Sequence, residues 1–109
     1  MDIRYCRDGR GDSPVKKAID QLDVKTQNKI LKTLYLVGQN GLAIGPPVLE
    51  KMHGTTPSIH EIRKRYKGFI RIFCYFDGRE FWLLHMIHKK SLKTPRPDLE
   101  LAQDRAKQI

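Results

Sequence analysis

The chain has 109 residues, 39% of them hydrophobic and 30% charged, with a net charge of +9, a composition typical of one globular domain over residues 1–109. No apolar run approaches the roughly 18–20 residues of a membrane-spanning helix, and the first residues contain no hydrophobic stretch typical of a signal peptide. These features exclude a membrane-embedded chain and, with only two isolated cysteines, predict a cytoplasmic protein.

The first half of the chain predicts one short strand and two helices. Residues 2–6 alternate as in a strand, and residues 8–12 break the chain with glycine and aspartate. Ser13-Pro14 predicts a helix start, because Ser can cap the exposed amides and Pro fits the first helical position. Asp23 can cap a second helix, which Gly38 or Gly41 ends. The apolar residues of both helices recur at helical spacing, so we expect a hairpin with one apolar side.

The second half changes to the spacing of strands. Gly45-Pro46-Pro47 forbids regular structure, and residues 48–57 are interpreted as a connecting segment. Residues 59–66, 69–76 and 80–87 then predict three strands, the last nearly all apolar and therefore central. Asp77-Gly78 between the last two predicts a type I′ turn, which needs positive φ at both positions. Thr94-Pro95 opens a final helix.

The element order is therefore β-α-α-β-β-β-α, which predicts an α+β fold with a small, mainly antiparallel sheet. The N-terminal helical hairpin covers one face of that sheet. We expect the other face to be more open.

Arg71 is the unusual residue of the strand over residues 69–76. Strand alternation places it with Phe69, Phe73 and Tyr75 on the face away from the helical hairpin. Because a guanidinium stays charged, an Arg within a sheet has to meet an anion or a carboxylate. The candidates are an RNA phosphate, which the nearby cations favour, and Glu61 on the neighbouring strand.

Further cations gather near the strand ends, since residues 51–109 carry thirteen basic and six acidic side chains. Antiparallel pairing predicts that Lys67 and Lys89 lie at the same end of the sheet. A cationic sheet end with aromatic residues can bind phosphates and stack bases, although basic strand ends also serve solubility. The candidate RNA-contacting residues are Arg63, Lys64, Arg65, Tyr66, Lys67, Lys89, Lys90 and Lys93.

Histidine is the usual acid or base for RNA cleavage at neutral pH. Simple alternation places His85 on the side of Phe81, Leu83 and Ile87, as a packed core residue, whereas His88 at the strand exit is better placed for proton transfer. No cluster has the spacing of a zinc or magnesium site, and no phosphate-binding glycine loop or serine-nucleophile motif is present. We therefore expect chemistry without metal or cofactor.

Several sequence stretches occur in an order that is more specific than any one of them. They are Tyr5 with Ser13-Pro14-Val15, then Glu61-Ile62-Arg63, residues 66–73, Leu83-Leu84-His85, Lys89-Lys90, Lys93-Thr94-Pro95, and Glu100, Ala102 and Arg105. Together they resemble the phage-derived HigB branch of the RelE/ParE toxin superfamily. The fold of that family, two helices on a small antiparallel sheet, agrees with the predicted order.

The resemblance implies the toxin of a type II toxin–antitoxin system, a metal-independent endoribonuclease that cleaves mRNA in the ribosomal decoding site. The 2′-hydroxyl of the RNA attacks the adjacent phosphate, and cations stabilise the charge that develops. By matching position, Arg71 is the phosphate-stabilising Arg, Arg63 is the basic position of the preceding strand, and Lys89 and Lys90 form the cationic segment. The C-terminal Tyr or His of many relatives is absent, so His88 or a lysine becomes the candidate acid or base.

The same resemblance implies a cognate antitoxin, expected to be a helix-turn-helix DNA-binding protein, as the partner that inhibits the toxin. Two other functions remain open, because fold alone does not fix activity. One is a non-catalytic protein that binds nucleic acid with the same basic surface. The other is a phage-derived inhibitor of a host protein that has kept the toxin fold.

Overall fold

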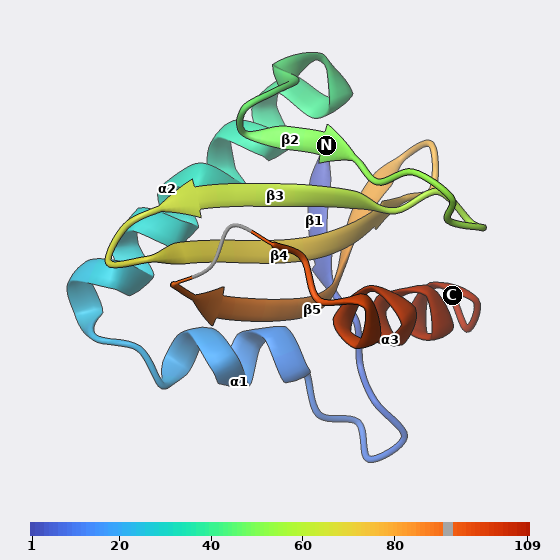
Figure 1. Ribbon diagram of the computed structural model, residues 1–109, viewed down its shortest axis with the longest axis horizontal. Coiled ribbons are helices and arrows are strands. Elements are labelled where there is room, and N and C mark those ends of the chain that lie inside the picture. The colour runs from blue at the N-terminus through green and yellow to red at the C-terminus, as the bar shows by residue number, and fades with distance from the viewer. Residues whose placement is uncertain (91–92) are drawn as a thin grey trace.

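The computed structural model describes residues 1–90 and 93–109. In chain order its elements are β1 (Asp2–Tyr5), α1 (Pro14–Asp20), α2 (Val24–Asn40), the short 3-10 helix η1 (Gly41–Ile44), β2 (Leu49–Lys51), β3 (His60–Arg65), β4 (Phe69–Phe76), β5 (Glu80–Lys89) and α3 (Arg96–Ala106). The strands form one sheet in the order β1-β5-β4-β3-β2 (Figure 1). β1 runs parallel to β5, and the other three pairs are antiparallel. The predicted α+β fold is confirmed.

The predicted helix starts are also confirmed. Ser13 Oγ accepts a hydrogen bond from the backbone N–H of Lys16 at 3.4 Å, and Asp23 accepts one from the N–H of Thr26 at 3.2 Å. Such caps satisfy amides that have no partner within the helix. Gly41, with a φ of 62°, follows the last residue of α2.

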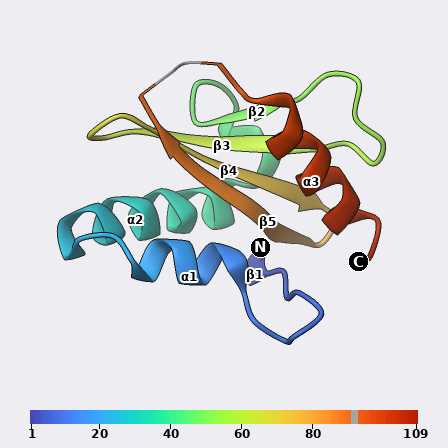
Figure 2. The ribbon, with the colours of Figure 1, turned by 60° about the horizontal axis from the view of Figure 1, so that its bottom comes forward.

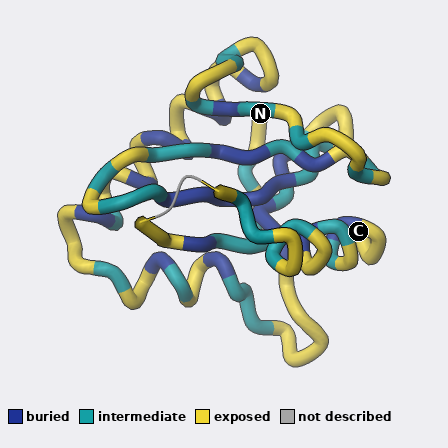
Figure 3. Tube along the Cα trace, viewed as in Figure 1, coloured by how far each residue is buried: buried dark blue, intermediate teal, exposed yellow. Residues whose placement is uncertain are grey.

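Helices cover both faces of the sheet (Figure 2). On one face, Ile70, Ile72 and Cys74 of β4 pack with apolar residues of α1 and α2. On the other, Phe73 of β4 packs with a second apolar cluster that includes Ala102 of α3. This second face is not bare, because α3 packs against β4 and β5 and the central strands are largely buried (Figure 3), but it remains the more open face at the end of β3, where Arg63 is partly exposed and Arg65 is exposed. We call the two surfaces the α1–α2 face and the α3 face.

The segment over residues 48–57 is more than the connection expected from the sequence, because it contains β2. This strand pairs with β3 through Leu49 opposite Ile62, Glu50 opposite Glu61 and Lys51 opposite His60. Three residues are too few for alternation to reveal a strand. Pro46 and Pro47 lack a backbone N–H, which prevents β2 from extending toward the N-terminus.

The turns differ from the prediction. Lys67 (φ 50°) and Gly68 (φ 107°) between β3 and β4 have positive φ, whereas only Gly78 does so in the β4–β5 turn. Asp77 instead uses its side chain, whose Oδ1 accepts the backbone N–H groups of Arg79 and Glu80, both at 2.8 Å. The Asp77-Gly78 turn is therefore not type I′, because an Asx-type side-chain bond replaces the left-handed backbone at Asp77.

A β-bulge in β5 changes which side chains share a face. Cys74 pairs with Leu83 and Phe73 pairs with His85, so Leu84 is an extra residue in the ladder. Leu84 and His85 consequently both lie on the α3 face, where Leu84 joins the second cluster and the His85 ring stacks on Phe73. Placing His85 with Phe81 and Leu83 by simple alternation was therefore wrong.

Candidate nucleic-acid interface

Rows of cross-strand neighbours bring several predicted site residues together near the β3–β4 turn. On the α3 face these rows are Arg65, Phe69 and Lys89; Arg63, Arg71 and Ile87; and Glu61, Phe73 and His85. The row on the opposite face is Lys64, Ile70 and His88. Four predicted cations thus share the α3 face, whereas Lys64 and His88 lie on the α1–α2 face.

Arg71 lies on the predicted face but is covered, with a relative exposure of 4%. Its Nη1 donates a hydrogen bond to Thr94 Oγ1 at 2.7 Å, and its Nε lies 3.6 Å from Glu61 Oε1. Thr94, in the segment before α3, in turn donates to Glu61 Oε2 at 2.9 Å. The pairing with Glu61 is therefore present, and Thr94 lies against both charged groups.

Glu61 is fully buried and also contacts Arg63, whose Nε donates to Glu61 Oε1 at 2.7 Å. Arg63 Nη1 contacts Glu50 of β2. The hydrogen bond to Glu61 raises the pKa of Arg63, with smaller effects from the charges of both carboxylates. The side chain of Arg63 remains 39% exposed, so this cation is both held in place and accessible to an anion.

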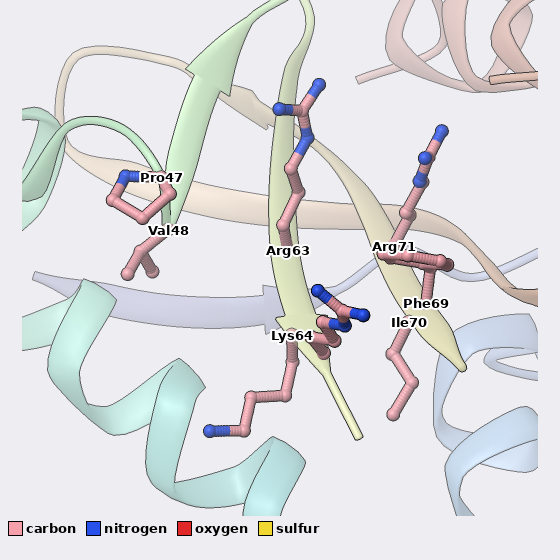
Figure 4. Close-up of a pocket in the computed structure, with 8 residues that line it drawn as sticks. Pro47, Val48, Arg63, Lys64, Phe69, Ile70 and Arg71 are labelled. Atoms are coloured by element: carbon pink, nitrogen blue, oxygen red, sulfur yellow. The ribbon is translucent and has the colours of Figure 1, made fainter. Parts of the chain in front are cut away.

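Four of the predicted cations line a hollow of about 430 Å³, which Figure 4 shows in close-up. It is lined by Arg63, Lys64, Arg65 and Arg71, and by Pro47, Val48, Phe69 and Ile70. Arg63 and Arg71 point to one side of the strands, and Lys64 points to the other. The hollow opens where β2 stops, so that the last residues of β3 are paired with β4 and have no strand on their other side. Cationic and apolar atoms together suit a phosphate with an attached sugar or base.

Tyr66 and Lys67 lie in the β3–β4 turn, toward α2. The ammonium groups of Lys29 and Lys67 lie 5.3 and 5.5 Å from the centre of the Tyr66 ring. Lys67 Nζ is also 3.8 Å from Asp23 Oδ2, at the start of α2. These two residues therefore extend the basic surface around the end of the sheet rather than joining Arg71.

The end of β5 carries the remaining predicted site residues. Lys89 pairs with Phe69 at the same sheet end as Lys67, as predicted, and its Nζ lies 3.8 Å from Asp98 Oδ2. Lys90 and Lys93 are exposed. His88 Nε2 lies 2.7 Å from the carbonyl oxygen of Lys67, on the face opposite Arg71. The structure therefore does not bring His88 together with the cations of the α3 face.

His85 and Asp98 form a second polar pair on the α3 face. His85 Nε2 lies 2.6 Å from Asp98 Oδ1, and their side chains are 18% and 22% exposed. Asp98 lies in the first turn of α3, where a negative charge is favourable for the helix. This pair also fastens α3 to β5.

A family model described as phage-derived protein Gp49-like (DUF891) matches residues 17–107. The chain belongs to this family. The match includes β2 to β5, α2 and α3, and thus every candidate site residue of this Gp49-like chain. A search of the curated proteins finds no match. In the described part of the Gp49-like chain, no helix is long and apolar enough to cross a membrane.

Four residues of this Gp49-like site have contacts that the sequence indicates only in part or not at all. Glu61 was considered only as a partner of Arg71, although its spacing two residues from Arg63 also places those side chains on one strand face. Thr94 and Asp98 contact the sheet from a segment distant in sequence, and no local pattern indicates those contacts. His85 was assigned to the wrong face because the bulge at Leu84 has no marker in the sequence.

Proposed function

We propose that this Gp49-like protein is the toxin of a type II toxin–antitoxin system and cleaves mRNA in the ribosomal decoding site. The observation that carries the proposal is the hollow that Arg63, Lys64, Arg65 and Arg71 line, in a chain of a toxin-like family. A net charge of +9 adds long-range attraction to the ribosome and its RNA.

Arg63 is the cation best suited to a first phosphate contact. Its guanidinium is held by Glu61 and Glu50 yet partly exposed, so little reorganisation is needed when a phosphate binds. Arg71 is deeper, and its Nη1 is already bonded to Thr94. In the proposed reaction the 2′-hydroxyl oxygen attacks the phosphorus, the bond to the 5′-oxygen breaks, and both arginines stabilise the added negative charge.

The resemblance that implies this activity also implies a cognate antitoxin as its inhibitor, expected to contain a helix-turn-helix DNA-binding domain. Growth arrest upon expression, relieved by co-expression of the neighbouring gene, is the expected outcome. It is measured by growth curves with separately inducible genes.

A second candidate is a non-catalytic protein that binds RNA with the same surface. The ion pair of Arg71 with Glu61 favours it, because the buried and already paired Arg71 has less charge left to stabilise a transition state, whereas the partly exposed Arg63 can still bind RNA. The two functions differ in one readout, since the binding protein leaves the message intact.

The test uses purified protein and ribosomes programmed with a defined mRNA, and the cut sites are mapped by primer extension. Arg63→Ala is expected to lower the cleavage rate about 10²–10³-fold, as for the loss of one group that stabilises a transition-state anion. Lys32→Ala is the matched control, because Lys32 is an exposed cation of α2 on the other side of the sheet. Intact mRNA with the unmodified protein, or equal rates for both variants, would contradict the proposal.

A further inference from the structure

The α3 face holds an imidazole–carboxylate pair that the proposed site has not yet used. His85 lies in the same cross-strand row as Glu61 and Phe73, and one row from Arg63 and Arg71. Neighbouring strands are about 4.8 Å apart and rows on one face about 7 Å apart, which keeps these groups within the dimensions of one nucleotide. His88, by contrast, faces the other side of the sheet.

Two contacts hold the His85 ring in one orientation. It stacks on Phe73 with the ring centres 6.0 Å apart and an angle of 11° between the planes. The Nε2 atom of His85 lies 2.6 Å from Asp98 Oδ1. The residue itself follows the bulge in β5. Among the described residues, the bond through Nε2 is the one hydrogen bond of the ring, and none involves the other nitrogen, Nδ1. A carboxylate that accepts Nε2–H leaves Nδ1 with a lone pair, as required of a proton acceptor.

We propose that His85 is the general base of RNA cleavage and that Asp98 is its positioning residue, an inference that rests on the proposed function. His85 Nδ1 removes the proton of the 2′-hydroxyl while the 2′-oxygen forms a bond to phosphorus and the bond from phosphorus to the 5′-oxygen breaks. The departing 5′-oxygen takes a proton from water, and the resulting hydroxide recovers the proton from His85. The products are a 2′,3′-cyclic phosphate and a 5′-hydroxyl.

The charged groups around the ring fit this role. Asp98 stabilises the imidazolium that forms when the proton is taken, and Lys89, whose Nζ lies 3.8 Å from Asp98 Oδ2, adds a cation for the phosphate. Arg71 of β4 lies in the adjacent row, next to Ile87 of β5. A base, its carboxylate and the phosphate-binding cations are thus supplied by β3, β4, β5 and the first turn of α3.

His85→Gln is the first test, because glutamine can still donate a hydrogen bond to Asp98 but cannot accept the proton. We expect cleavage on programmed ribosomes to fall about 10²–10⁴-fold, the usual contribution of a general acid or base, with unchanged ribosome binding and melting temperature. His53→Gln is the matched control, because His53 is an exposed histidine in the loop between β2 and β3. It should cleave like the unmodified protein.

Chemical rescue separates proton transfer from packing. Imidazole added to His85→Ala should restore part of the cleavage, because it can occupy the space of the missing ring, and it should not accelerate His85→Gln. Asp98→Asn should lower the single-turnover cleavage rate at saturating ribosome concentration and leave the dissociation constant of the ribosome complex unchanged.

Three results would overturn the assignment while leaving the proposed function intact: cleavage by His85→Gln at the unmodified rate, no rescue of His85→Ala by imidazole, or loss of cleavage in His88→Gln alone. A lower melting temperature of His85→Gln with weaker ribosome binding would assign the residue to the attachment of α3 and also overturn it. Failure of the unmodified protein to cleave any message is a different result, because it removes the proposed function itself.

Discussion

On the α1–α2 face of the sheet, β4 contributes Ile70, Ile72 and Cys74 to an apolar core, and burial raises the pKa of the Cys74 thiol well above its ordinary value. On the α3 face, the same strand contributes Phe73 to an apolar cluster and Arg71 to a network with Glu61 and Thr94. Burying charges is costly unless each finds a partner. The first face is therefore built for stability, and the second keeps charged groups at a cost that a binding or catalytic site can explain.

The largest effect is expected when this charge network is broken. Glu61→Gln should lower the free energy of unfolding by about 3–5 kcal/mol, because it leaves Arg71 buried without its counter-charge. Ile72→Val on the other face is the matched control and should cost about 0.5–1.5 kcal/mol. Both values come from denaturant unfolding. The double change Glu61→Leu with Arg71→Met should recover much of the loss, and equal losses for Glu61→Gln and Ile72→Val would contradict the contrast between the faces.

A smaller effect is expected at the cationic end of β5. Replacing Lys89 and Lys90 by Gln should reduce the slope of log K against log salt concentration for ribosome binding by about 1.4, since each phosphate contact to single-stranded RNA contributes about 0.7. The paired control is Lys25→Gln with Lys32→Gln, two exposed lysines of α2. An unchanged slope in the variant with both lysines replaced would mean that neither Lys89 nor Lys90 contacts a phosphate, and that RNA binds at residues 63–67 instead.

The smallest effect concerns His60, whose side chain lies at the start of β3. Burial, and to a smaller extent the charge of Lys51, lowers the pKa of His60 below its ordinary value of 6.5, and its buried Nδ1 has no hydrogen-bond partner among the described residues. The unfolded chain therefore takes up this proton more readily, so stability should decrease as the pH falls below about 6.5. His60→Gln should flatten that decrease in unfolding curves recorded between pH 7 and 5. A steeper decrease in the variant would mean that the sign is wrong.

Much of the fold could be predicted because the period of apolar residues changes from helical to alternating near the middle of the chain. The three long strands, the capped helices and the face of Arg71 follow from local patterns. β2 and the bulge at Leu84 could not be predicted, since a three-residue strand and one inserted residue leave no periodic signal. The bulge mattered most, because it moves His85 to the other face.

The cations of the candidate site could be predicted from the sequence, but most of their ion-pair and hydrogen-bond partners could not. Arg63, Lys64, Arg65 and Arg71 do line one hollow. The burial of Arg71 could not be predicted, because it depends on Thr94 and on where α3 crosses the sheet, both consequences of tertiary packing. In the sequence His88 is adjacent to Lys89 and Lys90, which favours His88 over His85 as the base. Strand register, however, places the two histidines on opposite faces of the sheet.

The chemical ends of the RNA fragments test the central claim most directly. Ribosomes carrying a defined message are incubated with the purified protein, and both new ends are identified by mass spectrometry, with a parallel message that has a 2′-deoxy sugar at the cut position. Attack by the RNA 2′-hydroxyl predicts a 2′,3′-cyclic phosphate or its hydrolysis product, a free 5′-hydroxyl, and a deoxy-substituted message that is bound but uncut. A 5′-phosphate end, or cleavage of the deoxy-substituted message at the normal rate, would contradict the account.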